Sequence, residues 1–162
     1  STFNIATNEV DSRYVNLKFI DNDEFIFFSN YNSPKSVAFK SHNQIAASIY
    51  WSSIDCQIRI KAKIKKMSTK YNSDYFKQRS QDKNALAISS KQSSAITSYD
   101  QVIEQYEYVK EHNDLSKCPE YWGGYSFKPY EIEFWEGHES RINKRDLYKL
   151  KQKKWHHFVL EP

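Results

Sequence analysis

The chain has 162 residues, 16% of them aromatic, and a formal net charge of +4, which suits one domain with a sizeable core and favours anionic ligands only mildly. Its longest apolar run, residues 25–28, is far too short to cross a membrane, and no signal-peptide pattern is present. Cys56 and Cys118 form no C-x-x-C pair, so we expect free thiols in a cytoplasmic protein.

The first 68 residues predict mostly strands. Ser33 followed by Pro34 is typical of a helix N-cap and its first helical position. The alternation in "CQIRIKAKIKK" places apolar residues on one face of a strand and basic residues on the other. The expected elements are, in chain order, a strand at 3–7, a hairpin of strands 13–21 and 24–30, a short helix at 33–42, and strands at 44–52 and 56–68.

The rest of the chain predicts helices and then strands again. Asp100 is a plausible cap for a helix with apolar residues at helical spacing. Gly123 and Gly124 are two of only three glycines, and we expect them to turn the backbone tightly with positive φ. Strands that come in hairpins favour an antiparallel sheet or barrel with helices at its margins. The expected elements are helices at 72–79, 82–91 and 98–113, a strand at 125–137, and a closing hairpin at 145–162.

Any phosphate bound by this chain has to be held by side chains. Three glycines cannot form a Gly-rich phosphate loop, and no histidines have metal-ligand spacing. Tyr75 and Arg79 share one face of a predicted helix, and Arg141 and Arg145 are also four residues apart. The basic face of strand 56–68 leaves a nucleic-acid-binding barrel as an alternative. That alternative is disfavoured because the interleaved residues are Ile and Ala rather than aromatic.

Several motifs, in this order along the chain, resemble the pyridoxamine 5′-phosphate oxidases. The most specific are "WGGYSFKPYEIEFWEG" (122–137) and "SKQSS" (90–94), and "SRYVNLK", "FFSNYNSPK", "CQIRIKAKI", "SDYFKQR" and "RINKR" support them. The resemblance covers essentially the whole chain. It implies one domain over 1–162 that lacks the N-terminal segment of the family. The implied fold is mainly β (α+β): an antiparallel FMN-binding split β-barrel with short peripheral helices, assembled as a homodimer with FMN at the interface.

The resemblance also implies an activity and a role for individual residues. The implied reaction is FMN-dependent oxidation of pyridoxamine or pyridoxine 5′-phosphate by O2, giving pyridoxal 5′-phosphate and H2O2. Arg141 and Asn143 are the candidate catalytic residues, and Gln92 and Ser93 are expected to reach FMN from the other subunit. The implied FMN contacts are Arg13, Lys18, Phe28, Ser29, Lys35, Gln57, Gln92, Ser93, Trp135 and Arg145. The implied substrate contacts are Lys18, Tyr75, Arg79, Lys83, Arg141 and Asn143, and no metal is implied.

Five positions depart from the pattern of the family. Pro34 stands where the family has an arginine that contacts the FMN phosphate, and Cys56 stands where it has the first arginine of RQVR. Lys83 replaces a serine near the substrate phosphate, Asn143 replaces a histidine near the substrate, and Lys144 replaces an aspartate. Substrate contacts have changed more than FMN contacts. An alternative is therefore a related flavoprotein that acts on another substrate, as in phenazine biosynthesis, or one that binds FMN or pyridoxal phosphate without this turnover.

Overall fold

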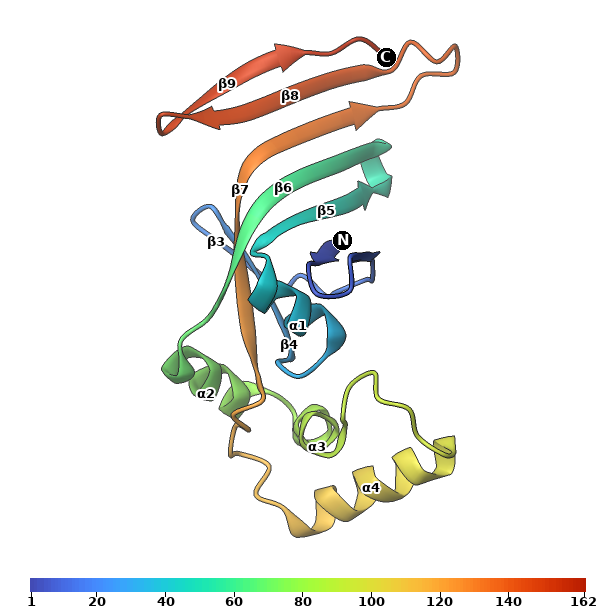
Figure 1. The fold of residues 1–162 in the computed structure, drawn as a ribbon, viewed down its shortest axis with the longest axis vertical. Helices are drawn as coiled ribbons and strands as arrows, with labels where there is room; N and C mark the ends of the chain where they lie inside the picture. The colour runs from blue at the N-terminus through green and yellow to red at the C-terminus, as the bar shows by residue number, and fades with distance from the viewer.

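The computed structural model describes all 162 residues as one nine-stranded antiparallel sheet flanked by four α-helices (Figure 1). The strands are β1 (Thr2–Asn4), β2 (Glu9–Asp11), β3 (Phe19–Asp21), β4 (Glu24–Asn30), β5 (Gln44–Trp51), β6 (Cys56–Lys66), β7 (Trp122–Glu136), β8 (Lys144–Lys151) and β9 (Lys154–Val159). The helices are α1 (Pro34–Ser41), α2 (Thr69–Gln78), α3 (Gln81–Ser89) and α4 (Tyr99–His112). The strand order is β2-β1-β5-β6-β7-β4-β3, with β8 on β7 and β9 on β8, so the sheet does not close on itself.

Strand β7 organises the sheet because three strands pair with it. β6 pairs with residues 125–136 on one edge of β7. β4 and β8 share the other edge, where β4 pairs with residues 122–127 and β8 with residues 131–136. Pro129 lies between these two halves, opposite Ala62, where the register of β6 and β7 shifts at a β-bulge. A proline has no N–H to donate to a neighbouring strand, and a β-bulge bends the strand that contains it. β7 accordingly curves between its two halves (Figure 1). The sheet is therefore split into two arms that β7 joins.

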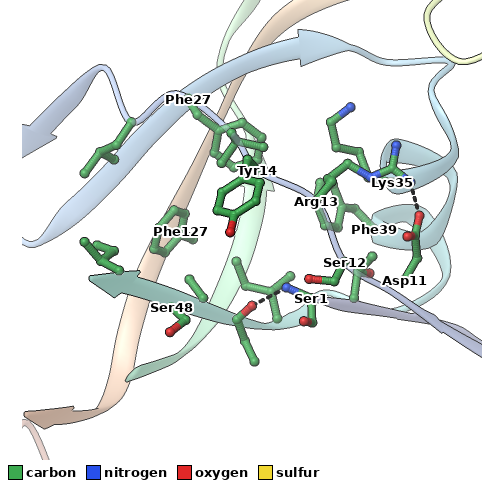
Figure 2. A pocket seen from close by; sticks show the side chains of 17 residues that line it. Ser1, Asp11, Ser12, Arg13, Tyr14, Phe27, Lys35, Phe39, Ser48 and Phe127 are labelled. Atoms are coloured by element: carbon green, nitrogen blue, oxygen red, sulfur yellow. Dashed lines mark hydrogen bonds and ion pairs between the residues drawn. The ribbon is translucent and has the colours of Figure 1, made fainter. Parts of the chain in front are cut away.

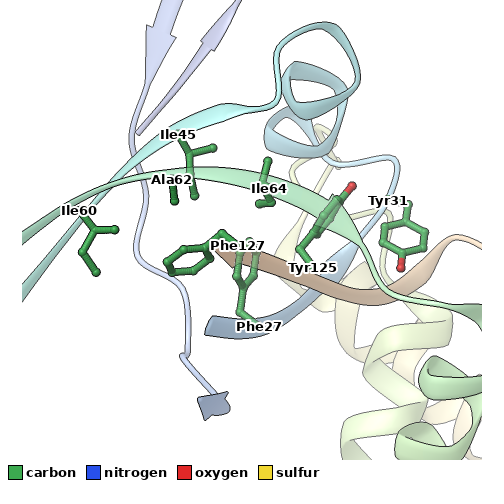
Figure 3. Packing of buried hydrophobic residues seen from close by; sticks show 8 residues of the cluster. All are labelled: Phe27, Tyr31, Ile45, Ile60, Ala62, Ile64, Tyr125 and Phe127. Carbon is green, nitrogen blue, oxygen red and sulfur yellow. The ribbon is translucent and has the colours of Figure 1, made fainter. Parts of the chain in front are cut away.

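The core lies where β4, β5, β6 and β7 meet α1. The inward residues of β6 are buried as the alternation predicted, and Phe27 packs against Tyr125 with ring centroids 5.7 Å apart. Figure 3 shows this cluster, whose members are Phe27, Tyr31, Ile45, Ile60, Ala62, Ile64, Tyr125 and Phe127.

The two adjacent glycines lie inside β7, and neither has a positive φ, so the predicted tight turn is wrong. Their backbone is instead approached very closely. A Cβ on Gly123 would lie 2.2 Å from Asn72 Nδ2 and 2.3 Å from the Tyr31 hydroxyl, and one on Gly124 would lie 2.8 Å from Met67 Cγ. A glycine is required here because a side chain would occupy space that these atoms already fill.

A buried polar network holds α2 against this part of β7. The Gly124 N–H donates to Asn72 Oδ1 at 2.8 Å, Asn72 Nδ2 donates to the Tyr31 oxygen at 2.9 Å, and the Tyr31 hydroxyl donates to Gly124 O at 3.0 Å. Burial raises the pKa of Tyr31 to about 12, so this hydroxyl keeps its proton. Each buried polar group thus has a partner, which fixes the position of α2.

Three other predictions differ from the structure. The predicted strand 13–21 is observed only over Phe19–Asp21. Its pairing with β4 ends at the hydrogen bond from the Lys18 N–H to Ile26 O, which is 2.8 Å long. The cap of α4 is Ser98, whose Oγ accepts the Gln101 N–H at 3.2 Å, and not Asp100. β2 was not predicted. None of the four helices has the length and apolar character needed to cross a bilayer.

Gly123→Ala should destabilise the fold, because the new methyl group collides with Asn72 and Tyr31. We expect a loss of about 1–3 kcal/mol in the free energy of unfolding, measured by urea denaturation. Gly137→Ala is the control, since its Cβ would meet atoms only at 3.4 Å, an ordinary contact. Equal losses in the two variants would contradict the close-approach explanation.

Candidate functional site

A cleft of about 400 Å³ opens beside α1 (Figure 2). The irregular segment 11–15 and strand β5 form its rim, and core aromatic residues such as Phe27 and Phe127 form its floor. Arg13 and Lys35 lie together on one wall, and Asp11 forms an ion pair with Arg13. The cleft therefore combines an apolar surface with a cationic end.

Lys35 is a buried ammonium group that no carboxylate neutralises. The residue is 5% exposed, and its Nζ donates to Ser33 Oγ at 3.0 Å and to Gln92 Oε1 at 3.1 Å. Burial, with a smaller contribution from the charge of Arg13, lowers the pKa of Lys35 to about 8. An anion bound beside Lys35 would offset the cost of burying this charge.

Three donors converge on the amide oxygen of Gln92 at the end of β4. Ser29 Oγ, the Asn30 N–H and Lys35 Nζ reach Gln92 Oε1 at 3.1, 3.3 and 3.1 Å. A phosphate oxygen is a stronger acceptor for such donors, so the donor set fits a phosphate group. All these contacts lie within one chain, and the expectation that Gln92 reaches FMN from the other subunit stays a prediction. Ser93 follows in an exposed turn with φ 69°.

The predicted substrate-phosphate residues meet at the junction of α2 and α3. Arg79 Nη2 donates to Lys83 O at 3.1 Å, and its guanidinium lies 4.4 Å from the centroid of the Trp122 ring. Arg79 Nη1 is buried without a hydrogen-bond partner, and burial lowers the pKa of Arg79. Tyr75 stacks on Phe28 with ring centroids 4.0 Å apart. Arg79 is thus, after Lys35, a second cation in the predicted site, and its Nη1 lacks a hydrogen-bond partner.

Three predicted FMN contacts form one row across the other arm of the sheet. Trp135 of β7 pairs with Gln57 of β6 on one side and with Arg145 of β8 on the other. Arg145 forms an ion pair with Glu133 at 2.9 Å. These residues share one face of the sheet, because paired residues of neighbouring strands project to the same side.

The β7–β8 loop beyond this row carries the two candidate catalytic residues. Arg141 is exposed and has φ 63°, which a non-glycine residue rarely adopts. Asn143 Oδ1 accepts the His138 N–H at 3.1 Å, so this side chain holds the loop closed.

The predicted FMN contacts therefore fall in two clusters, one near each end of β7. Ser29 pairs with Gly123 near the start of β7, whereas Trp135 lies near its end (Figure 1). Twelve residues of a straight strand would span about 40 Å, and the bend of β7 brings its ends closer than that. Lys18, next to β3, is exposed to solvent.

Sequence reasoning missed Asn30, Trp122 and Glu133, which contact predicted site residues. Asn30 contributes a backbone N–H, which no sequence pattern reveals. The ring of Trp122 and the carboxylate of Glu133 both lie within "WGGYSFKPYEIEFWEG", so this motif was the available signal.

The basic face of β6 is largely neutralised. Arg59, Lys61 and Lys65 form ion pairs with Glu133, Glu131 and Glu24 at 3.2, 2.9 and 2.6 Å. This pairing argues against the nucleic-acid alternative, because a phosphate backbone binds unpaired cations.

Comparisons with known proteins agree with the fold and motifs. The family described as "Pyridoxine 5′-phosphate oxidase C-terminal dimerisation region" matches residues 122–162. A pyridoxine/pyridoxamine 5′-phosphate oxidase of Vesicomyosocius okutanii is 36% identical over 160 residues, which cover 96% of this chain and 76% of that protein.

Two solved structures share the fold. PhzG from Burkholderia lata, solved with tetrahydrophenazine-1-carboxylic acid, has a TM-score of 0.91 at 22% identity and covers 99% of this chain and 79% of its own. A pyridoxamine 5′-phosphate oxidase-related, FMN-binding protein from Nostoc punctiforme has a TM-score of 0.81 at 13% identity, covering 99% and 84%.

The fold is thus the antiparallel split barrel of these proteins, as predicted. Within that class, the chain belongs to the pyridoxine/pyridoxamine 5′-phosphate oxidase family.

The lowered pKa of Lys35 predicts a pH-dependent stability of the ligand-free protein. Lys35 titrates near 8 in the folded state and near its ordinary value of 10.5 when unfolded. Between these values the unfolded state binds more protons, so the free energy of unfolding should rise with pH, by at most about 1.4 kcal/mol per pH unit.

Lys35→Met should lack this rise. Urea unfolding of both proteins from about pH 7 to 10, in phosphate-free buffer, measures the difference in slope. Parallel curves for parent and variant would contradict the buried, unpaired ammonium.

Proposed function

We propose that this chain is the subunit of a homodimeric FMN-dependent oxidase that converts pyridoxamine or pyridoxine 5′-phosphate to pyridoxal 5′-phosphate with O2, giving H2O2 and, from the amine with water, NH3. The observation that carries the proposal is the division of the FMN residues of the family into two clusters at opposite ends of β7. Membership of the family supports the reaction, and the FMN-binding neighbour supports the cofactor.

The first cluster of one copy holds the FMN phosphate. Lys35 and Arg13 supply charge, and Ser29 and the Asn30 N–H supply neutral donors. Charge-assisted hydrogen bonds to a dianion are the strong ones, so most of the binding free energy comes from this end. Lys18 and Phe28 complete the contacts of this copy, while Gln92 and Ser93 of the other copy reach the same FMN.

The second cluster acts on the flavin of the other copy. Gln57, Trp135 and Arg145 form one row on the sheet, and the match to a dimerisation region spans residues 122–162, which include two of them. Residues 1–162 form one domain in this proposal. The free thiols of Cys56 and Cys118 fit a cytoplasmic location.

The substrate phosphate lies at the junction of α2 and α3. Arg79 offers its unpartnered Nη1, Tyr75 offers a hydroxyl, and Lys83 adds a point charge where the family has serine. Lys18 of the same copy and the β7–β8 loop of the other copy, with Arg141 and Asn143, complete this site.

FMN, when bound, would supply the two-electron redox chemistry of this reaction. The residues of the chain bind both phosphates and orient the two ring systems, and the aromatic stack of Phe28, Tyr75 and Trp122 fixes the wall beside them. No protein nucleophile is required, in line with the absence of a triad motif from the sequence.

A second candidate is a related flavoprotein with another substrate. It is favoured by the TM-score of 0.91 to PhzG and by Asn143, whose Oδ1 is occupied by the His138 N–H. Flavin absorbance of the purified protein tests the cofactor, and peroxide release with pyridoxamine 5′-phosphate separates the two candidates.

A mixed dimer should restore one FMN site. Arg13→Ala and Arg145→Ala each remove one charge-assisted contact, and each homodimer should bind FMN about 10- to 100-fold more weakly than the parent. A heterodimer of the two variants has one site with both lesions and one with neither. We expect one FMN per heterodimer at parental affinity, measured by fluorescence titration.

Lys63→Ala is the control, because Lys63 is exposed and forms no ion pair. Two equally weakened sites in the heterodimer would show that a single copy supplies both clusters, and the dimeric site would be abandoned.

Asn143→His should raise turnover of pyridoxamine 5′-phosphate with little change in KM. An imidazole can titrate near neutral pH, which an amide cannot, whereas Tyr75, Arg79 and Lys83 still hold the phosphate. Asn143→Asp is the control, because it keeps the acceptor for the His138 N–H without adding an imidazole. No peroxide from any variant, despite bound FMN, would favour the second candidate.

A further inference from the structure

Glu133 is a buried carboxylate held between two arginines on the outer face of the sheet. Its side chain is 10% exposed, Oε2 accepts from Arg59 Nη1 at 3.2 Å, and Oε1 accepts from Arg145 Nε at 2.9 Å and forms an ion pair with Arg145 Nη2 at 2.9 Å. The three residues lie on β6, β7 and β8, so the contact crosses the whole arm that carries Trp135 and Arg145.

Glu131, two residues earlier on β7, has the same arrangement with lysines. Its carboxylate pairs with Lys61 at 2.9 Å and with Lys149 at 3.1 Å. An ammonium group rotates freely about its stem, whereas a guanidinium is planar and presents its donors in fixed directions. Only the Glu133 pair can therefore define the orientation of a cation.

Two donors of Arg145 are engaged in hydrogen bonds. A guanidinium has five N–H groups. The N–H on Nε donates to Glu133 Oε1, and Nη1 donates one N–H to Glu161 O, each at 2.9 Å. One N–H on Nη1 and the two on Nη2 remain, and all three lie in the plane that these bonds fix. The side chain of Arg145 is 24% exposed, so the remaining donors have access to a ligand.

We propose that Glu133 is a positioning residue that holds the Arg145 guanidinium so that its remaining N–H groups meet FMN. This inference rests on the proposed function, in which Arg145 contacts the cofactor of the other copy. Arg59 binds the second carboxylate oxygen and thereby keeps Glu133 from turning away from Arg145.

Positioning and charge neutralisation make opposite predictions. Glu133 cancels one positive charge, so its removal would strengthen the binding of anionic FMN if charge alone mattered. If orientation matters, removal lets the guanidinium rotate, and ordering it again on binding weakens affinity. The sign of the change therefore distinguishes the two roles.

The test compares Glu133→Gln with Glu131→Gln, a matched control that also breaks two ion pairs on the same strand face. FMN affinity is measured by fluorescence titration of the whole dimer. We expect Glu133→Gln to weaken FMN at least about tenfold, the loss of one charge-assisted hydrogen bond, and Glu131→Gln to leave affinity within about twofold.

A double-variant cycle supplies the second readout. In an Arg145→Ala background, Glu133→Gln should cause no further loss of affinity, and both single variants should shift the visible flavin bands in the same way. If Glu133→Gln fails to fold, Arg145→Lys replaces it. This variant keeps the positive charge and the ion pair but lacks the planar guanidinium, and we expect a similar loss of FMN affinity.

Each contrary result has a separate meaning. A parent protein that binds no FMN overturns the proposed function and this inference with it. If the parent binds FMN while Glu133→Gln binds it equally or more tightly, or if the losses of Glu133→Gln and Arg145→Ala add, the positioning role alone is overturned.

Discussion

The backbone of β7 at Gly123 and Gly124 lies in direct contact with Asn72 and Tyr31, and much of the molecule is placed by this contact. It sets α2 against the sheet at a distance that no side chain on β7 would permit. Since Tyr75 lies on α2 and Arg79 caps it, the same contact sets both residues beside Phe28 and Trp122. Tyr31 follows β4 directly, so the donors at the end of that strand are tied to the same point.

The bend at Pro129 gives β7 two partners on one edge, and it also separates two kinds of cation. Near the start of β7, Lys35 is buried without a carboxylate. Near its end, Arg145 is held by Glu133. An unpaired cation attracts an anion, whereas a paired guanidinium directs hydrogen bonds, so the two arms suit different parts of one nucleotide.

The sequence predicted elements well wherever the pattern depended on the element itself. The alternation in β6 and the Ser33-Pro34 start of α1 are examples. It failed for residues 13–18, because β propensity does not reveal whether a partner strand is available. The prediction also failed for Gly123. A backbone with a positive φ and a backbone that another group approaches closely both require a residue without a Cβ, so the sequence has glycine in either case.

For the candidate site, the resemblance indicated which residues bind FMN or substrate but not which of these residues contact one another. Lys35 and Gln92 were both assigned to FMN, and nothing in the sequence indicated that they touch each other. Glu133 lies within the most specific motif, but the motif does not indicate its partners. Acidic residues alternate with apolar ones in this part of β7, and only the fold shows which carboxylate lies between two guanidinium groups.

The contact between Gln92 and its three donors has a consequence for how tightly any phosphate can be held. Gln92 Oε1 already accepts hydrogen bonds from Ser29, Asn30 and Lys35. A phosphate that binds these donors therefore has to replace the Gln92 oxygen as their acceptor. A measured dissociation constant therefore reports the difference between two acceptors. The internal oxygen also stabilises the ligand-free protein, because a buried ammonium group without a hydrogen-bond acceptor would favour unfolding.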